Sequence, residues 1–173
     1  MWIIISLELL TFGAALVIMM VYRNEDPALF HQSRLQLSRV MGTINTVFLL
    51  TSGYCMAESA RKLKLQEFKS ARFFLRLTIL FGLFFVVLKL FEYSQKLEAG
   101  LGFSANMFFS FYWSLTIFHL AHVLTGLVIL LFFFIRFRKS TGPAVAEYES
   151  ATVFWHLCDM IWLLIFPALY LLF

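Results

Sequence analysis

Five long apolar segments follow one another along the chain, each interrupted by only a few charged residues. They cover residues 2–22, 40–60, 73–93, 108–135 and 150–173. The runs are continuous rather than alternating, which favours helices over the strands of a β-barrel. About 20 apolar residues in a helix cross a hydrocarbon core of about 30 Å. The pattern therefore predicts an all-α bundle of five transmembrane helices, forming a single transmembrane domain over residues 1–173.

Composition agrees with this pattern and excludes other classes of protein. Of the 173 residues, 61% are hydrophobic and only 14% are charged, whereas a soluble domain carries about 25% charged residues. A disordered chain, a nucleic-acid-binding module and an ordinary cytosolic enzyme are all excluded, so no nucleic-acid partner is expected. The two cysteines, Cys55 and Cys158, lie in separate apolar segments. Their spacing suits neither a metal site nor a disulfide framework.

The lysines and arginines predict the orientation in the membrane. Five spans place the N-terminus and the loops around residues 61–76 and 136–139 on one side. That side holds nine of the fourteen basic residues: Arg61, Lys62, Lys64, Lys69, Arg72, Arg76, Arg136, Arg138 and Lys139. The other side holds four: Arg23, Arg34, Arg39 and Lys96. Basic residues follow the first segment, which by itself favours the opposite orientation, but the larger total predicts a cytoplasmic N-terminus and an external C-terminus.

Seven ionisable residues interrupt the apolar segments: Glu8, Lys89, Glu92, His119, His122, His156 and Asp159. A charged side chain in the middle of a spanning helix costs roughly 2.5–3.5 kcal/mol on insertion scales. These side chains are therefore expected to turn inward and meet partners, or to line water. Six of them form pairs three positions apart, so both members of each pair share one helix face.

Depth along each helix divides the seven residues into two expected layers. Glu8, His156 and Asp159 would tie the first segment to the fifth, nearer the cytoplasm. The remaining four residues would tie the third segment to the fourth, nearer the outside, with Lys89 and Glu92 as an ion pair close to the outer interface. His119 and His122 are expected to be hydrogen-bonded core histidines, and Asp159 to hold His156. Glu8 is either protonated or paired with a histidine, and it is the candidate for proton handling.

A metal or haem site is the alternative interpretation of the same residues. Two segments each carry a pair of potential ligands at i and i+3, as bundle-core metal sites do. The depth estimates separate His119 from His156, which argues against a shared ion. There is no phosphate-binding glycine loop, nucleophile elbow or HExxH motif. The sequence therefore predicts no catalytic residue and no metal ligand, and it assigns no residue to lipid.

Longer strings around these residues resemble a known family. The last segment reads FWHLCDMIWLLIF over residues 154–166, and His156, Asp159 and Trp162 fill the aromatic–Trp–His–x–x–Asp–x–x–Trp pattern of the cytochrome c oxidase subunit III family. The string FHLAHVLTG over residues 118–126 is similar to the family's His–x–x–His motif. Five further residues fit the family: Glu8, Asn45-Thr46 and Glu92-Tyr93.

Departures from the family pattern indicate a branch. Leu120 stands where the family has glycine, Lys89 replaces a glutamine, and two N-terminal helices of the seven-helix members have no counterpart. A five-helix chain with Lys–x–x–Glu-Tyr looks most like the subunits associated with nitric oxide reductases (NorE-type). Subunit III of quinol oxidases is a five-helix cousin.

The resemblance implies an accessory subunit of a bacterial cytoplasmic-membrane complex. Haem, with copper or non-haem iron, would belong to a catalytic partner subunit and not to this chain. The chain would bind phospholipid, support proton uptake through Glu8, and use the other intramembrane polar residues as a scaffold. Taken on their own, the residues leave open two alternatives, a small proton-coupled transporter and an intramembrane metalloenzyme.

Overall fold

The computed structural model describes residues 2–137 and 143–172, and all the regular structure in them is helical. The elements are α1 (Trp2–Glu25), α2 (Pro27–Leu35), α3 (Arg39–Lys64), α4 (Phe68–Glu98), α5 (Met107–Arg136) and α6 (Val145–Tyr170). All except α2 are long and apolar enough to cross a membrane, which confirms the predicted five spans. The helices α4 and α6 begin earlier than predicted, and α6 ends at Tyr170. Phe173 lies outside the described residues.

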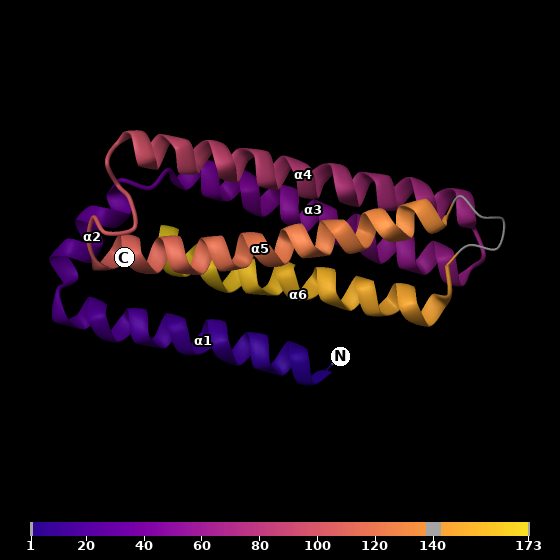
Figure 1. The fold of residues 1–173 in the computed structure, drawn as a ribbon, viewed down its shortest axis with the longest axis horizontal. Helices are drawn as coiled ribbons and strands as arrows, with labels where there is room; N and C mark the ends of the chain where they lie inside the picture. Colours follow the sequence, from indigo (N-terminus) through magenta and orange to yellow (C-terminus); the bar gives the residue numbers. More distant parts are fainter. Residues whose placement is uncertain (1, 138–142, 173) are drawn as a thin grey trace.

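Four of the long helices form a closed ring, and the fifth lies outside it (Figure 1). The helix α3 packs against α4 and α6, and α5 packs against the same two neighbours. The helix α1 contacts only the α5 and α6 side of this ring. Among the described side chains of α1, only Phe12, Leu16 and Met19 are buried. The helices α3, α4, α5 and α6 therefore enclose an interior, whereas the edge of the molecule along α1 is open.

A tryptophan from α6 fixes the distance between helices in the ring. Trp155 is fully buried and packs on Gly82 of α4 and Gly126 of α5, where a Cβ would lie 3.0 Å and 2.8 Å from its ring. Its indole N–H donates to Ser52 Oγ of α3 at 3.1 Å, and Ser52 donates to the Thr78 carbonyl of α4 at 2.8 Å. The Trp155 side chain thus contacts α3, α4 and α5. A side chain larger than that of glycine at position 82 or 126 would collide with its ring.

The short helix α2 was not predicted. Asp26 caps it by accepting a hydrogen bond from Leu29 N at 3.1 Å, and Pro27 occupies the first turn, where a missing N–H has no cost. Phe30 is buried edge-on against Phe108 of α5, with ring centroids 5.7 Å apart. The connection from α1 to α3 is therefore anchored to one end of the ring.

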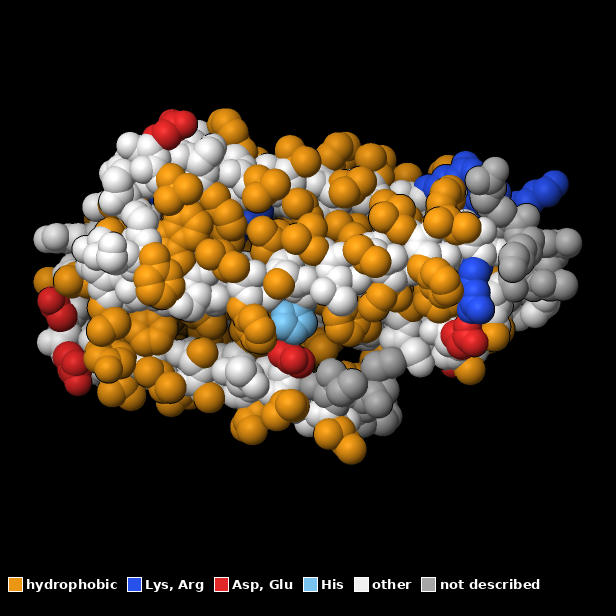
Figure 2. Space-filling view, in the orientation of Figure 1, with side chains coloured by type: hydrophobic (Ala, Val, Ile, Leu, Met, Phe, Trp, Pro, Cys, Tyr) orange, Lys and Arg blue, Asp and Glu red, His pale blue; other side chains and the backbone are white. Residues whose placement is uncertain are grey.

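Basic side chains gather at the other end, where α3 leads into α4 (Figure 2). Lys64 of α3 pairs with Glu149 of α6 at 2.6 Å, while Arg72 and Arg76 of α4 lie over the Phe134 ring of α5. Both predicted basic loops thus belong to the same end of the bundle, because two spans, α4 and α5, separate them. Arg138 and Lys139 lie outside the described residues.

Each of the five long helices is continuous. A proton-coupled transporter of the common kind carries its site where helices are broken near the midplane. Within the described helices, the only internal proline is Pro167, in the last turn of α6. The transporter alternative therefore gains no support from the fold.

Candidate functional site

The most enclosed polar group is a cluster of four side chains inside the ring, Lys89, Glu92, Tyr112 and Tyr170, which we call the Lys89 cluster. Lys89 Nζ donates to Glu92 Oε2 at 3.0 Å, to Tyr170 Oη at 2.8 Å and to Tyr112 Oη at 3.4 Å. Both tyrosine hydroxyls donate to Glu92 Oε1, at 2.6 Å from Tyr170 and 3.1 Å from Tyr112. All three ammonium protons and both carboxylate oxygens are used, so the cluster is closed.

Aromatic rings surround the ammonium group of this cluster. Lys89 Nζ lies 5.0–5.4 Å from the ring centroids of Tyr93, Tyr112, Trp162 and Tyr170, a distance at which a cation is attracted to a ring face. Lys89 is 1% exposed and Glu92 is 0% exposed. The predicted ion pair is therefore present, and three helices enclose it. Tyr170 adds α6 to a layer that was expected to join only α4 and α5.

His119 is held by ring packing and not by hydrogen bonds. It is fully buried on α5, stacked on Trp162 at 5.3 Å and edge-on to Phe85 at 5.7 Å. Neither ring nitrogen has a hydrogen-bond partner in the described parts of the chain. Trp162 in turn donates from its indole nitrogen to Thr46 Oγ1 at 2.9 Å. The prediction of a hydrogen-bonded core histidine was therefore wrong for His119, because aromatic rings fill the space around it.

His122 points to a different surface and meets Glu8 of α1. The atoms His122 Nε2 and Glu8 Oε2 are 3.2 Å apart, and these side chains are 15% and 20% exposed. The prediction that Glu8 would join His156 and Asp159 was wrong, because α1 lies along α5 and brings Glu8 to the level of His122. Pairing of the Glu8 carboxylate with a histidine was the other expectation, and the structure confirms it. Figure 2 shows a histidine and an acidic side chain meeting in the middle of an otherwise apolar face.

The Glu8–His122 pair can hold one proton. His122 Nδ1 lies 2.8 Å from the Phe118 carbonyl, and a carbonyl can only accept, so Nδ1 carries a hydrogen. Nε2 is then a bare acceptor when the imidazole is neutral. A favourable contact with Glu8 therefore needs one proton on either Nε2 or the carboxylate. The pair therefore joins an acid and a base between two of the long helices, α1 and α5.

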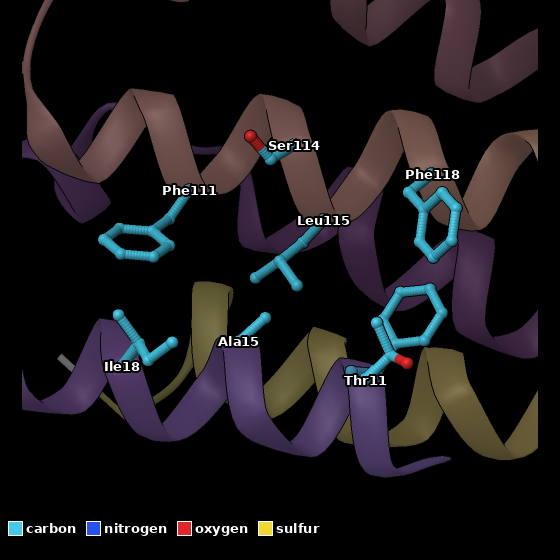
Figure 3. Close-up of a pocket in the computed structure, with 8 residues that line it drawn as sticks. Thr11, Ala15, Ile18, Phe111, Ser114, Leu115 and Phe118 are labelled. Carbon is cyan, nitrogen blue, oxygen red and sulfur yellow. The ribbon is translucent and has the colours of Figure 1, made fainter. Parts of the chain in front are cut away.

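A groove of about 420 Å³ lies beside this pair, between α1 and α5 (Figure 3). Its lining is mostly apolar and consists of Thr11, Phe12, Ala15, Ile18, Phe111, Ser114, Leu115 and Phe118. Both Phe12 and Phe118 also contact the His122 ring, at centroid distances of 5.9 Å and 4.7 Å. The groove thus leads along α1 to the Glu8–His122 pair.

His156 and Asp159 form the third polar pair, with Nδ1 and Oδ2 3.2 Å apart, as their spacing predicts. The pair does not turn into the ring. The His156 side chain is 37% exposed, and the carboxylate lies against Gly53 of α3, where a Cβ would be 2.2 Å from Asp159 Oδ2. The expectation that these residues bind the first segment was therefore wrong, because α6 presents them to α3 at the outer wall.

The polar residues do not converge on one centre. No group of three His, Cys, Asp or Glu side chains suited to a metal ion occurs within residues 2–137 and 143–172. His119 lies inside the ring, His122 faces α1, and His156 faces α3. The sequence missed Tyr112 and Tyr170, whose hydroxyls complete the Lys89 cluster. A tyrosine on a neighbouring helix, at the level of a buried Lys–x–x–Glu pair, would have identified them. Only the packing of the helices shows which tyrosines lie at that level.

Comparison with known proteins places this architecture in a family. A family model described as cytochrome c oxidase subunit III matches residues 7–172. The chain belongs to the cytochrome c oxidase subunit III family. Three relatives show the breadth of this family.

The chain is 32% identical over 132 residues to cytochrome c oxidase subunit 3 of Alkalihalophilus pseudofirmus, with 75% of this chain and 64% of the relative covered. It is 25% identical to cytochrome bo(3) ubiquinol oxidase subunit 3 of Buchnera aphidicola, covering 99% and 84%. It is also 25% identical to haem–copper oxidase subunit I+III of Aeropyrum pernix, covering 99% of this chain and 22% of that protein. The chain spans less than two-thirds of the length of the cytochrome c oxidase subunits it matches.

Proposed function

We propose that this subunit III homologue is a non-redox accessory subunit of a respiratory haem–copper oxidase or nitric oxide reductase complex. The observation that carries the proposal is the closed Lys89 cluster in a chain of this family. The polar groups of this cluster are all used in contacts that join α4, α5 and α6. Such contacts stabilise the packing of the helices. Haem, with copper or non-haem iron, would then belong to a companion catalytic subunit. The Aeropyrum pernix relative, named as subunits I and III together, supports such a companion.

The proposed location is the bacterial inner membrane, with the N-terminus in the cytoplasm. The end of the bundle that carries Lys64, Arg72 and Arg76 would face the cytoplasm under the positive-inside rule. Relatives from bacteria such as Alkalihalophilus pseudofirmus and Buchnera aphidicola support the assignment of the membrane.

Within the family, Lys89 favours the nitric-oxide-reductase-associated branch (NorE-type). It stands where the family pattern has a glutamine, and in this chain it organises the whole cluster through bonds to Glu92, Tyr112 and Tyr170. A change from a neutral amide to a cation at this point is a structural difference and not a surface variation. The relatives that are named as oxidase subunits support the other branch, and the purification experiment described below distinguishes the two.

A role in proton uptake and a role in lipid binding are further parts of the proposal. The Glu8–His122 pair supports the first, since it can hold a proton beside a partly exposed groove. The groove between α1 and α5 supports the second, because its apolar lining and its volume of about 420 Å³ suit an acyl chain. Glu8 would bind and release a proton, and it would not be a catalytic residue.

Purification of the full-length, affinity-tagged chain in mild detergent from membranes of its own organism tests the proposal. We expect a haem-bearing polypeptide in a fixed ratio to the tagged chain. Its optical spectrum, and its consumption of oxygen or of nitric oxide, would then decide the branch. Stoichiometric haem or metal on the isolated chain, with no companion, would contradict the proposal.

A further inference from the structure

Four polar side chains lie at the end of the bundle where α2 leads into α3, opposite the basic end (Figure 1). We call them the Arg34 cluster: Ser33, Arg34, Arg39 and Lys96. Lys96, near the end of α4, donates from Nζ to the Gln36 carbonyl. Asn106, at the start of α5, donates from Nδ2 to Ser33 Oγ at 2.9 Å. These two hydrogen bonds bring α4 and α5 to the segment that contains Arg34.

Arg34 has no counter-charge among the described residues. It is only 6% exposed, and none of the ion pairs within residues 2–137 and 143–172 includes it. Its Nε is buried without a hydrogen-bond partner, whereas the two terminal nitrogens are open to the surface and donate to no described residue. An arginine stays protonated in a protein, and an unpaired charge held away from water is costly. The terminal nitrogens of Arg34 are therefore available to an anion from outside the chain.

Two further cations add to this charge. Arg39 lies near enough to repel Arg34, and burial together with this repulsion holds the pKa of Arg34 below its usual value. Lys96 is 9% exposed, and its bond to the Gln36 carbonyl uses only one of its three protons. Glu92 attracts Lys96 from a distance, but both oxygens of that carboxylate are bonded within the Lys89 cluster. The positive charge of the Arg34 cluster is therefore not neutralised locally.

The two ends of the bundle differ in how their cations are paired. At the basic end, four cations pair with carboxylates of this chain: Arg61 with Glu58, Lys62 with Glu67, Lys64 with Glu149 and Arg136 with Glu147. The acidic side chains at the end of the Arg34 cluster are exposed: Glu25, Asp26 and Glu98. In the part of the chain that the structure describes, none of these three forms an ion pair with the cluster. The cluster thus differs from the basic end in having cations without an acidic partner.

The donors of the cluster suit a phosphate group. Arginine presents a planar fork of N–H groups that matches phosphate oxygens. The Ser33 hydroxyl accepts from Asn106, and its own proton has no acceptor in the described residues. A phosphate group has more acceptor oxygens than a carboxylate, so it can bind a guanidinium, an ammonium and a hydroxyl together. Since α2 connects two candidate membrane spans, the cluster lies at the level at which a bilayer presents its headgroups.

We propose that the Arg34 cluster binds a phosphate group, supplied either by a phospholipid headgroup or by free phosphate. Arg34 would hold the phosphate through its two terminal nitrogens, while Arg39 and Lys96 provide the remaining positive charge. The site shares no residue with the groove between α1 and α5, and it does not depend on a companion subunit. A bound phosphate would stabilise the contacts of α2 with the ends of α3, α4 and α5.

Thermal unfolding of the full-length chain tests the proposal. The chain would be purified in a non-ionic detergent, stripped of lipid, and melted with tryptophan fluorescence as the signal. Sodium phosphate would be compared with sodium chloride at equal ionic strength. Phosphatidylglycerol would be compared with a phosphate-free galactolipid that carries the same acyl chains. Because a ligand of the folded state raises the melting temperature, we expect a rise of a few degrees with phosphatidylglycerol and none with chloride or the galactolipid.

The two additions distinguish the sources of the phosphate. A rise with both inorganic phosphate and phosphatidylglycerol would support a site for the phosphate group itself. A rise with phosphatidylglycerol and not with inorganic phosphate would assign the site to a lipid headgroup. A rise with the galactolipid as large as that with phosphatidylglycerol would show that only acyl chains bind, and it would overturn the proposal. No response to either phosphate compound would overturn it as well.

Substitution of the exposed Arg39 links the response to the cluster. Without phosphate, Arg39→Gln should leave the melting temperature unchanged or raise it, because the repulsion of Arg34 is removed. With phosphatidylglycerol it should lose at least half of the rise, and Arg34→Gln should lose nearly all of it. Arg61→Gln is the matched control, because Arg61 is a 59% exposed cation that is paired with Glu58. An equal rise in all three variants would overturn the proposed site, and it would do so even if Arg34→Gln failed to fold and only the other two were compared.

Discussion

Two acid–base pairs of the long helices, Lys89–Glu92 and Glu8–His122, have opposite surroundings. The first lies inside the ring of α3 to α6, 1% and 0% exposed, with two tyrosines using every remaining hydrogen-bonding site. The second lies outside the ring, 20% exposed at Glu8 and 15% at His122. Enclosure makes the first pair part of the framework. The open edge along α1 leaves the second pair partly exposed, as the proton-handling role proposed for Glu8 requires.

Removal of the Lys89 ammonium is expected to lower the stability of the chain more than the other substitutions. Lys89→Met would leave the Glu92 carboxylate and two tyrosine hydroxyls buried without their cation. Breaking a buried ion pair in this way costs roughly 3–5 kcal/mol. We expect a large fall in the melting temperature of the purified chain in detergent, followed by tryptophan fluorescence. Lys69→Met, at an exposed position near the basic end, is the control, and an equally small effect from both would contradict the account.

Adding one methyl group at two glycines compares the ring with α1. Gly126→Ala would place a Cβ 2.8 Å from the buried ring of Trp155. Overpacking of this kind typically costs roughly 1–3 kcal/mol, more than the gain of about 1 kcal/mol from replacing glycine in a helix. Gly13→Ala on α1 meets nothing within 4 Å and should be neutral or stabilising. Thermal unfolding of both variants measures the difference, and matching shifts would show that Trp155 does not set the helix spacing.

Asp159→Ala should have a smaller effect on the isolated chain. Its partner His156 lies on the same helix and is 37% exposed, so the lost contact joins no two helices. We expect a decrease of roughly 0.5–1 kcal/mol in the free energy of unfolding, measured by thermal unfolding in detergent. A loss as large as that of Lys89→Met would mean that this pair also belongs to the framework.

Glu8→Gln should leave folding nearly unchanged, within about 0.5 kcal/mol, as is usual for a change outside a packed core. The amide keeps the shape of the side chain beside His122, but it cannot take up or release a proton as a carboxylate does. We expect a changed pH dependence of turnover in the assembled complex, with normal assembly. Turnover that matches the unsubstituted complex at every pH would remove Glu8 from proton handling.

The pair formed by Lys62, in the last turn of α3, and Glu67, in the connection to α4, gives the smallest effect. Lys62 donates to the Glu67 carboxylate at 2.7 Å, and this hydrogen bond lowers the pKa of Glu67. Because the folded value lies below the unfolded one, the stabilisation is present above the ordinary pKa of a glutamate and is lost as pH falls through the lowered value. Glu67→Gln should abolish only this acid-side dependence, measured as melting temperature against pH.

Sequence spacing predicted the parts of the site that depend on a single helix. Continuous apolar runs identified the five long helices, and the three-residue spacing identified Lys89–Glu92 and His156–Asp159. Both follow from the geometry of one helix, which the sequence contains directly. The helix α2 was missed because its hydrophobic signal is short, and its stability comes from the Asp26 cap and from Phe30 docking on α5.

The sequence could not predict which helices are neighbours. Depth estimates grouped Glu8 with His156, but a helix at the right depth can lie against either side of a ring, and α1 brings Glu8 to His122. The same limit hid Tyr112 and Tyr170, because tyrosines near helix ends are usually interfacial anchors. His119 was expected to need a hydrogen bond, yet the rings of Phe85 and Trp162 occupy its surroundings.

A double-mutant cycle on Lys89 and Glu92 tests most directly whether buried ionisable groups stabilise the bundle by satisfying one another. Melting of Lys89→Met, Glu92→Leu and the combined variant would be compared with that of the unsubstituted chain under identical conditions. We predict that each single change is severe and that the double variant recovers much of the loss, because no unpaired charge remains buried. Additive losses, with the double variant the least stable of all, would contradict the account.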